Sequence, residues 1–300
     1  MNSPRRYPLP TRKFPPRWTV PPPRVRRRWW DSRAVIGFMI LLIIIGGTVF
    51  AHALTPYGPQ EVDPENQFVM PNREHPFGTD LFGRDVFTRV LHGGRTTLFT
   101  GVVAVIVASV PGTILGLFAG YFSKRLDVLI MRSMDVMLSF PGILLALAIV
   151  AALGPGLFNV VLAVGIAGIP NYTRVVRASV LVARKTLYVR AAHSVGVRHL
   201  RIIFRHILPN ISGSILALAT VDVAWAILNA SALSFLGLGV QPPTAEWGAM
   251  LNEGRGHLYD APWVTIGPGA VLMLTILAIN LLGDSLRDSL DPRLQTHLGR

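Results

Sequence analysis

The chain has 300 residues, of which 51% are hydrophobic and 15% charged, and its formal net charge is +13. This composition is typical of an integral membrane protein rather than of a soluble domain. The chain contains no cysteine, which excludes disulfides, thiolate metal ligands and a cysteine nucleophile.

The N-terminal residues 1–33 are rich in proline and arginine and lack the apolar periodicity of a helix or strand. We expect a disordered, basic cytoplasmic tail that ends in an interfacial anchor at Trp29 and Trp30. A targeting peptide is the alternative, because the Ala-His-Ala at 51–53 resembles a cleavage site. The apolar stretch before it runs for about twenty residues, longer than a signal-peptide core, and this favours an uncleaved first span.

Six apolar runs have the composition of membrane spans. They cover residues 34–54, 97–122, 134–153, 157–173, 209–236 and 264–283. With the N-terminus placed in the cytoplasm, 24 of the 29 Lys and Arg residues fall on the cytoplasmic side and 5 on the other. This positive-inside asymmetry predicts an all-α integral membrane fold with six transmembrane helices and both termini in the cytoplasm. The net charge is therefore a signal of topology rather than of nucleic-acid binding.

Two sizeable segments are expected on the external side, at residues 55–95 and 237–263. The first is polar and contains several Pro and Gly residues, and its end near 75–87 is typical of a turn leading into an interfacial amphipathic helix. The second is too apolar and too rich in Gly and Pro for a free loop. We expect it to fold back against the outer face of the helix bundle.

Gly112, Gly116 and Gly120 lie on one helical face of the second span. Small residues let two helix backbones approach closely in lipid, so this face is expected to pack against another helix. A lipid-facing helix that tolerates glycine is the alternative. Pro111 and Pro141 predict kinks in the second and third spans, because proline removes a backbone N–H donor.

Two acidic residues, Asp135 and Asp222, lie at the edge of a predicted span or within one. Ionisable groups at such positions normally face the bundle interior. We expect Asp135 to pair with Arg132 or with a basic residue of the neighbouring loop. Asp222 falls near the middle of the fifth span, where it either lines a translocation path or takes part in a structural hydrogen bond with Asn229.

The segment 174–208, between the fourth and fifth spans, carries eight Arg or Lys residues and no Asp or Glu. Each Arg at the bilayer centre costs about 2.5 to 3.5 kcal/mol, so this segment must project into the cytoplasm. Ala191 and Ala192 offer a small-residue helical face, and Gly196 permits a sharp change of direction. Pro209 is expected to start the fifth span, where a missing N–H does little harm. The pattern predicts a short structured loop available to a partner.

The sequence shows no apparatus for binding phosphate. A phosphate-binding loop of the Walker A type requires Gly-Lys-Ser/Thr, and none of Lys13, Lys124 and Lys185 follows a glycine. If ATP drives this protein, another chain binds the nucleotide.

Catalytic and metal-binding patterns are also missing from the basic segment. Ser194 has the small neighbours of a hydrolase nucleophile but follows a basic helix instead of a buried strand. His193, His199 and His206 have no carboxylate within the segment to complete a metal site. We predict neither an enzyme nor a metal protein.

The basic segment resembles the cytoplasmic signature of inner-membrane permease subunits of binding-protein-dependent ABC importers. The matching residues are Ala191, Ala192, Gly196, His206, Leu208 and Pro209, and Arg190 occupies the position directly before the paired alanines. Residues 77–86, 135–141, 205–210 and 233–243 resemble, more narrowly, the dipeptide/oligopeptide/nickel branch and its "C"-type subunit. The resemblance covers residues 34–292. The chain departs from the usual pattern at two positions, since Arg190 and Ala230 stand where the family usually or often has Glu.

This resemblance implies a permease subunit that forms a translocation path with a homologous permease subunit in the bacterial inner membrane. It implies that the basic segment is a coupling loop docked on one of two cytoplasmic ATPases, with ATP and Mg bound there and no cofactor on this chain. An external binding protein would deliver the cargo, most often di- or oligopeptides. Nickel or other small solutes remain alternatives within this family. A secondary transporter driven by an ion gradient, with Asp222 as the coupling acid, is the alternative outside it.

The predicted organisation has four parts. Residues 1–33 form the tail, 34–95 the first transmembrane helix and a periplasmic segment, 96–292 the permease domain, and 293–300 a C-terminal tail.

Overall fold

The computed structural model describes residues 32–290. The predicted anchor at Trp29 and Trp30, nearly all of the predicted N-terminal tail and the C-terminal residues 293–300 lie outside that range. Within it the chain is helical and contains no strand, apart from an isolated bridge between Thr79 and Asp85. The prediction of an all-α fold is confirmed for this part of the chain.

The helical elements follow one another along the chain as α-helices, short 3-10 helices (η1, η3) and one π-helix (η2). They are α1 (Ser32–Val49), α2 (Ala51–Leu54), η1 (Pro64–Asn66), α3 (Val86–Tyr121), α4 (Lys124–Leu138), α5 (Gly142–Leu153), α6 (Leu157–Ala183), α7 (Leu187–Ser194), α8 (His199–Arg201), η2 (Ile202–Ile207), α9 (Leu208–Phe235), α10 (Trp247–Gly254), η3 (Arg255–His257) and α11 (Trp263–Leu290).

Four helical runs of the described chain are long and apolar enough to cross a membrane. They are Ser32–Val49, Val86–Tyr121, His199–Phe235 and Trp263–Arg287. A fifth span is added if α4 and α5 count as one broken span, because they meet at 86°. The helix α6 covers the fourth predicted span, but its second half carries Arg174 and Arg177. The structure therefore supports a multi-pass membrane protein, and the number six stays a prediction.

The kinks predicted at proline turned out differently at the two sites. Pro141 directly precedes α5 and lies at the 86° bend, so the third predicted span is broken rather than gently kinked. Proline ends a helix because it lacks the N–H donor and clashes with the preceding turn. Pro111, by contrast, lies inside α3 without ending it.

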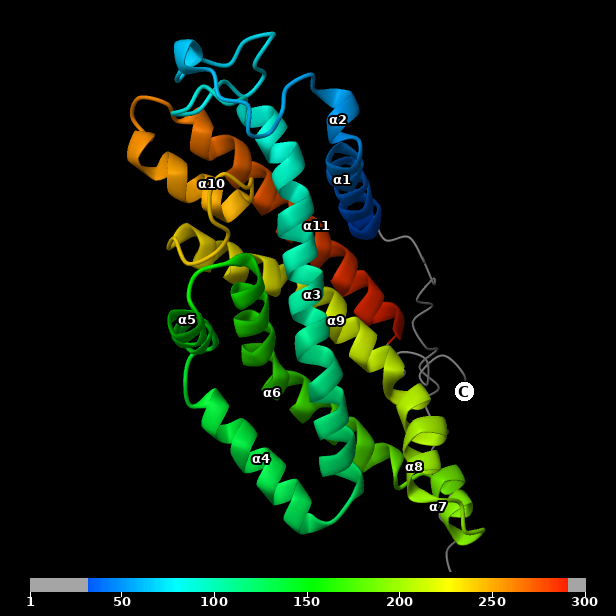
Figure 1. Ribbon diagram of the computed structural model, residues 1–300. Coiled ribbons are helices and arrows are strands. Elements are labelled where there is room, and N and C mark those ends of the chain that lie inside the picture. The colour runs from blue at the N-terminus through cyan, green and yellow to red at the C-terminus, as the bar shows by residue number, and fades with distance from the viewer. Residues whose placement is uncertain (1–31, 291–300) are drawn as a thin grey trace, which may run out of the picture.

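The most extensive helix pair joins α3 to α6, with α9 and α11 alongside (Figure 1). The glycines of α3 make this pair close. A Cβ atom added at Gly112 would lie 2.5 Å from Tyr172 Cβ, and one at Gly116 would lie 2.7 Å from Val176 Cβ. One at Gly120 would meet Val180 Cβ at the same 2.7 Å. Because the residue numbers of the contacting pairs rise together along α3 and α6, the two helices run parallel. This is the relation expected between a second and a fourth span.

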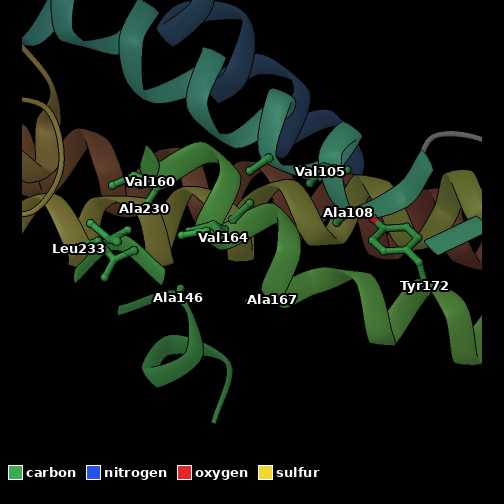
Figure 2. Packing of buried hydrophobic residues seen from close by; sticks show 13 residues of the cluster. Val105, Ala108, Ala146, Val160, Val164, Ala167, Tyr172, Ala230 and Leu233 are labelled. Carbon is green, nitrogen blue, oxygen red and sulfur yellow. The ribbon is translucent and has the colours of Figure 1, made fainter. Parts of the chain in front are cut away.

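The buried apolar residues form three clusters along the bundle. The central cluster draws on α3, α5, α6 and α9, with Val105, Ala146, Val164 and Leu233 among its members (Figure 2). A second cluster surrounds Trp247 at the end of the molecule that carries α10. The third lies at the opposite end, where α7 and α8 join the bundle (Figure 1). The basic segment is therefore packed onto the bundle instead of hanging from it.

The segment before α3, which is predicted to be external, ends in the predicted turn, and the helix that follows is α3 itself. Asp85 caps this helix, since its Oδ2 accepts from the Thr88 N–H at 2.7 Å. Val86 and Thr88 are 1% and 0% exposed. The expected interfacial amphipathic helix is absent from this part of the described chain, because the first turn of α3 is buried in the protein.

The second external segment folds back onto the bundle, as predicted. Trp247, at the start of α10, is fully buried, and its indole Nε1 donates to the Val90 carbonyl at 2.9 Å. Glu246 is also buried and caps α10 by accepting from the backbone N–H groups of Gly248 and Ala249.

A largely buried ionic network joins the two segments that are predicted to be external. Arg84 donates to Asp80 at 2.6 Å and to Glu253 of α10 at 2.7 Å. Arg89 donates to the same Glu253 at 3.1 Å and lies 3.6 Å from Asp80. Both arginines are almost completely buried. Removing one member of such a network lowers stability, because a buried charge then loses a partner.

Candidate functional site

The basic segment 174–208 starts within the second half of α6, and the part beyond that helix begins at Arg184. Arg184 follows the last residue of α6, and its Nη1 donates to the Gly120 carbonyl at 2.9 Å. Gly120 belongs to the final turn of α3, where backbone carbonyls lack helical partners and a cation is favourable. This contact ties the start of that part to the end of α3.

The helix α7 is followed by a sharp turn at Gly196. This glycine has φ +79, in the left-handed region that costs other residues roughly 1–2 kcal/mol. The turn is closed by the Val197 N–H, which donates to the Ala192 carbonyl at 3.1 Å. Beyond it the chain enters α8. The change of direction expected at Gly196 therefore lies at that residue.

The helix α7 presents an apolar face that no described residue covers. Leu187 and Val195 are 81% and 79% exposed, and Ala191 between them is exposed as well. Their spacing of four residues places the three on one side of the helix. Ala192 is only half-exposed and packs against the third apolar cluster. Ala191 and Ala192 thus face different directions, since adjacent helical residues are about 100° apart.

Hydrogen bonds connect the segment to two long helices. Asn210 Nδ2, in the first turn of α9, donates to the Tyr188 hydroxyl of α7 at 2.6 Å. Tyr121, the last residue of α3, shares a 2.9 Å hydrogen bond with His199 Nδ1 of α8. Together with the apolar contacts of Val189, these bonds make the segment one packed unit with the ends of α3, α6 and α9. Sequence reasoning missed Tyr188, Asn210 and Tyr121, although each is a polar residue next to a helix end.

Pro209 lies in the first turn of α9, as expected, but the helical run does not begin there. The helical run begins earlier, at His199, and passes through η2, which contains His206, into α9. The Leu208 N–H bonds to the Ile203 carbonyl, five residues back, as in a π-helix. A regular α-turn here would set the Pro209 ring against the Arg205 carbonyl. The wider π-turn accommodates the proline without ending the helix.

The polar groups within α9 are arranged differently from the expectation. Asn229 Nδ2 donates to the Trp225 carbonyl of its own helix at 2.7 Å, and no hydrogen bond joins it to Asp222 in the described chain. Asp222 instead has Tyr172 of α6 as its electrostatic neighbour, although their geometry falls short of a hydrogen bond. The predicted pairing of Asp222 with Asn229 is therefore wrong. A place for either residue on a translocation path stays a prediction.

Two ion pairs hold α4 against α6. Arg177 contacts both carboxylate oxygens of Asp127, at 2.5 and 2.7 Å. Arg174 donates to Asp135 at 2.7 Å, so Asp135 pairs across to α6 and not with Arg132. Because α6 leads directly into the rest of the basic segment, these pairs link α4 to the same structural unit.

The serine and histidines of the segment have structural surroundings. The Ser194 hydroxyl donates to the Arg190 carbonyl one turn earlier at 3.1 Å. The rings of His193 and His199 lie 5.6 Å apart. Within residues 32–290, no three His, Asp or Glu side chains gather as metal ligands would.

Comparison with known proteins relates most of the chain to transport permeases. Residues 112–296 match the family described as "binding-protein-dependent transport system inner membrane component". The chain is 46% identical over 266 residues to a dipeptide transport system permease protein of Alkalihalophilus pseudofirmus, which covers 89% of this chain and 88% of that one. It is also 46% identical over 273 residues to a glutathione transport system permease protein of Escherichia coli, covering 91% and 89% of the two chains.

A solved structure shares the fold. A chain of the MetNI methionine ABC transporter, in an inward-facing conformation, superposes with a TM-score of 0.55 at 16% sequence identity. The match covers 67% of this chain and 96% of that chain.

Proposed function

Because this chain belongs to the family of binding-protein-dependent transport system inner membrane components, we propose that it lines one half of an ABC importer's translocation path. A homologous permease subunit forms the other half. The observation that carries the proposal is the 46% identity over 89% of the chain to a dipeptide permease protein. Family membership favours the permease subunit over the secondary transporter that Asp222 had left open.

The proposed topology has six spans with both termini in the cytoplasm. The parallel packing of α3 on α6 supports it, since the second and fourth spans of such a chain cross in the same direction. The distribution of 24 Lys and Arg residues on one side and 5 on the other supports it as well. In this arrangement α10 lies on the external side, and α7 and α8 lie in the cytoplasm.

We propose that α7, Gly196 and α8 dock on a cytoplasmic ATPase subunit, which binds ATP and Mg in place of this chain. The uncovered apolar face of Leu187, Ala191 and Val195 is the surface that a partner would bury. The hydrogen bonds of Tyr188 and Tyr121 then carry a displacement of α7 to α9 and α3. This link explains how a separate motor moves the membrane helices.

The proposed cargo is a short peptide delivered by an external binding protein. The relatives named for dipeptide, peptide and glutathione transport support this class of cargo. Asp222 is proposed to lie close to the path, at the α6–α9 contact beside Tyr172.

Co-purification tests the proposed assembly. An affinity-tagged copy of this chain, expressed with its neighbouring transport genes, is expected to retain a second permease and an ATPase that contains a Walker A sequence. Isolation of this chain without any nucleotide-binding subunit, from membranes in which that subunit is present, would refute the assembly.

A further inference from the structure

A pocket of about 840 Å³ opens between the ends of α3 and α6 and the segment α7–α8. Its basic wall is made by Arg184, Lys185 and Arg190, and its aromatic wall by Tyr121 and Phe122. The docking proposed above uses the apolar face of α7 and leaves this pocket unassigned. Its volume falls within the range of pockets that hold small ligands or headgroups.

The ionisable side chains of the pocket wall are predominantly basic. His193 and His199 add two titratable groups to the three permanent cations, and no acidic residue of the described chain lines it. The Arg184 guanidinium uses Nη1 on the Gly120 carbonyl. The side chains of Lys185 and Arg190 are exposed and form neither a hydrogen bond nor an ion pair with residues 32–290. Unpaired cations around a concavity favour an anion that supplies several acceptor oxygens.

The position of the pocket relative to the membrane narrows the choice of anion. Tyr121 and Phe122 follow the apolar run of α3 on its cytoplasmic side, and their rings contact edge to face at 5.2 Å. Aromatic residues at the end of a span lie at the depth of the lipid headgroups. Basic pockets between transmembrane helices on the cytoplasmic side bind anionic headgroups.

The pocket and the apolar face lie on different sides of α7. Arg190 and His193 line the pocket, whereas Leu187 and Val195 belong to the apolar face. At 3.6 residues per turn, the centres of these two sides are roughly 130° apart around the helix. A ligand in the pocket and an ATPase on the apolar face can therefore be bound together.

We propose that this pocket binds the phosphate-bearing headgroup of an anionic phospholipid of the phosphatidylglycerol class, in the cytoplasmic leaflet. The phosphate contacts Lys185 and Arg190, and the acyl chains run along the end of α3 past Phe122. The bound lipid holds the α7–α8 segment at the membrane surface while the ATPase is docked. The proposal rests on the proposed function for the side of the membrane on which the segment lies and for the docked ATPase.

Lipid retention by the intact importer complex tests the proposal. The purified complex is titrated with short-chain phosphatidylglycerol or phosphatidylcholine, and bound lipid is counted by native mass spectrometry. The double variant Lys185→Gln/Arg190→Gln is expected to bind phosphatidylglycerol about 30-fold more weakly, because each basic residue near an anionic surface contributes roughly 1 kcal/mol and 1.4 kcal/mol is tenfold. Phosphatidylcholine binding is expected to stay unchanged.

A matched variant controls for loss of charge. Arg132→Gln/Arg287→Gln removes two exposed cations from α4 and α11, on the same predicted side of the membrane and outside the lining of the pocket. It is expected to bind phosphatidylglycerol like the wild type. Equal loss in both variants would show a diffuse surface effect and overturn the proposal.

Two further outcomes would also overturn the lipid site. Displacement of phosphatidylglycerol by millimolar inorganic phosphate would identify a free anion as the occupant. Loss of ATPase subunits from the pocket variant, with lipid binding intact, would identify a carboxylate of the ATPase. Failure of the proposed function is distinguishable, since the wild-type chain would then lack a bound ATPase while its selectivity for phosphatidylglycerol remained.

Discussion

At the scale of single residues, a substitution at Gly196 tests the backbone conformation of the turn without disturbing side-chain packing. A Cβ atom at this position would meet nothing within 4 Å, so only the φ of +79 opposes a side chain there. Gly256, in η3, offers the same open space without a positive φ. The two glycines therefore separate the effect of the turn from the effect of adding atoms.

We predict that Gly196→Val slows ATP-driven uptake by about tenfold, because roughly 1–2 kcal/mol of left-handed strain shifts α7 relative to α8. The level of the protein in the membrane is expected to stay normal, since the site is exposed. Uptake of labelled peptide and immunoblotting of membranes measure the two quantities. Gly256→Val is expected to transport normally. Normal transport by Gly196→Val would contradict the docking role of the turn.

Arg89 is the second residue whose role can be isolated. Its guanidinium is 1% exposed and donates to Glu253 and to the Pro59 carbonyl. Arg89→Met is expected to lower the stability of the purified protein by about 1.5–3 kcal/mol, because the Glu253 carboxylate keeps Arg84 as a partner but loses one charge-assisted hydrogen bond. Thermal unfolding in detergent measures the change. Arg73→Met, at an exposed arginine of the same segment, is the control and is expected to leave the stability unchanged.

At the scale of elements, the α3–α6 pair depends on the absence of side chains at Gly112, Gly116 and Gly120. We predict that Gly116→Leu destabilises the folded subunit by at least about 1–3 kcal/mol, because overpacking must separate the two helices. Its Cβ would meet both Val176 and the Thr173 carbonyl. Gly46→Leu is the matched control, since Gly46 also lies in an apolar helix but faces open space. Equal melting temperatures for the two variants would show that the glycine face is dispensable.

The sequence predicted the helices well, because lipid imposes a simple rule of length and apolarity on each span. Every predicted span has a helix at its position, and the glycine spacing of α3 falls at a close contact. The break at Pro141 and the continuous helix through Pro209 were not predictable. Proline has the same local chemistry at both sites, and neighbouring turns decide whether the helix continues. The π-turn of η2 makes that difference at Pro209.

The polar contacts of the site were the least predictable part. Asp135 and Asp222 were recognised as ionisable groups at the edge of a span or within one, yet their neighbours Arg174 and Tyr172 of α6 were not. These partners come from a helix distant in sequence, so no local pattern encodes them. The same holds for Asn210 and Tyr188, which meet only after η2 has brought α9 beside α7.

At the scale of the whole molecule, the proposed topology can be tested by labelling introduced cysteines, because the chain has no native cysteine. Tyr259 is 100% exposed next to η3, and Arg125 is exposed in the first turn of α4, outside the apolar face that the ATPase is proposed to cover. In intact cells with a permeable outer layer, Tyr259→Cys is expected to react with a membrane-impermeant maleimide. Arg125→Cys is expected to react only after the membrane is opened. The reverse pattern would place α10 in the cytoplasm and invert the topology.

The arginine network and the α7–α8 unit lie at opposite ends of the molecule. The end proposed to be external carries the arginine network and α10, and the other end carries the packed unit of α7 and α8 (Figure 1). The long helices α3 and α9 join them. In the proposed assembly, motion produced by an ATPase at one end travels through these helices to change access at the other.

The most direct measurement is solute uptake by proteoliposomes that contain this chain and its partner permease, with external binding protein and internal ATP. We predict accumulation of a short peptide against its gradient only when the ATPase subunits are present. Accumulation at an equal rate without any ATP-hydrolysing subunit would contradict the central claim that a separate motor drives this permease through α7.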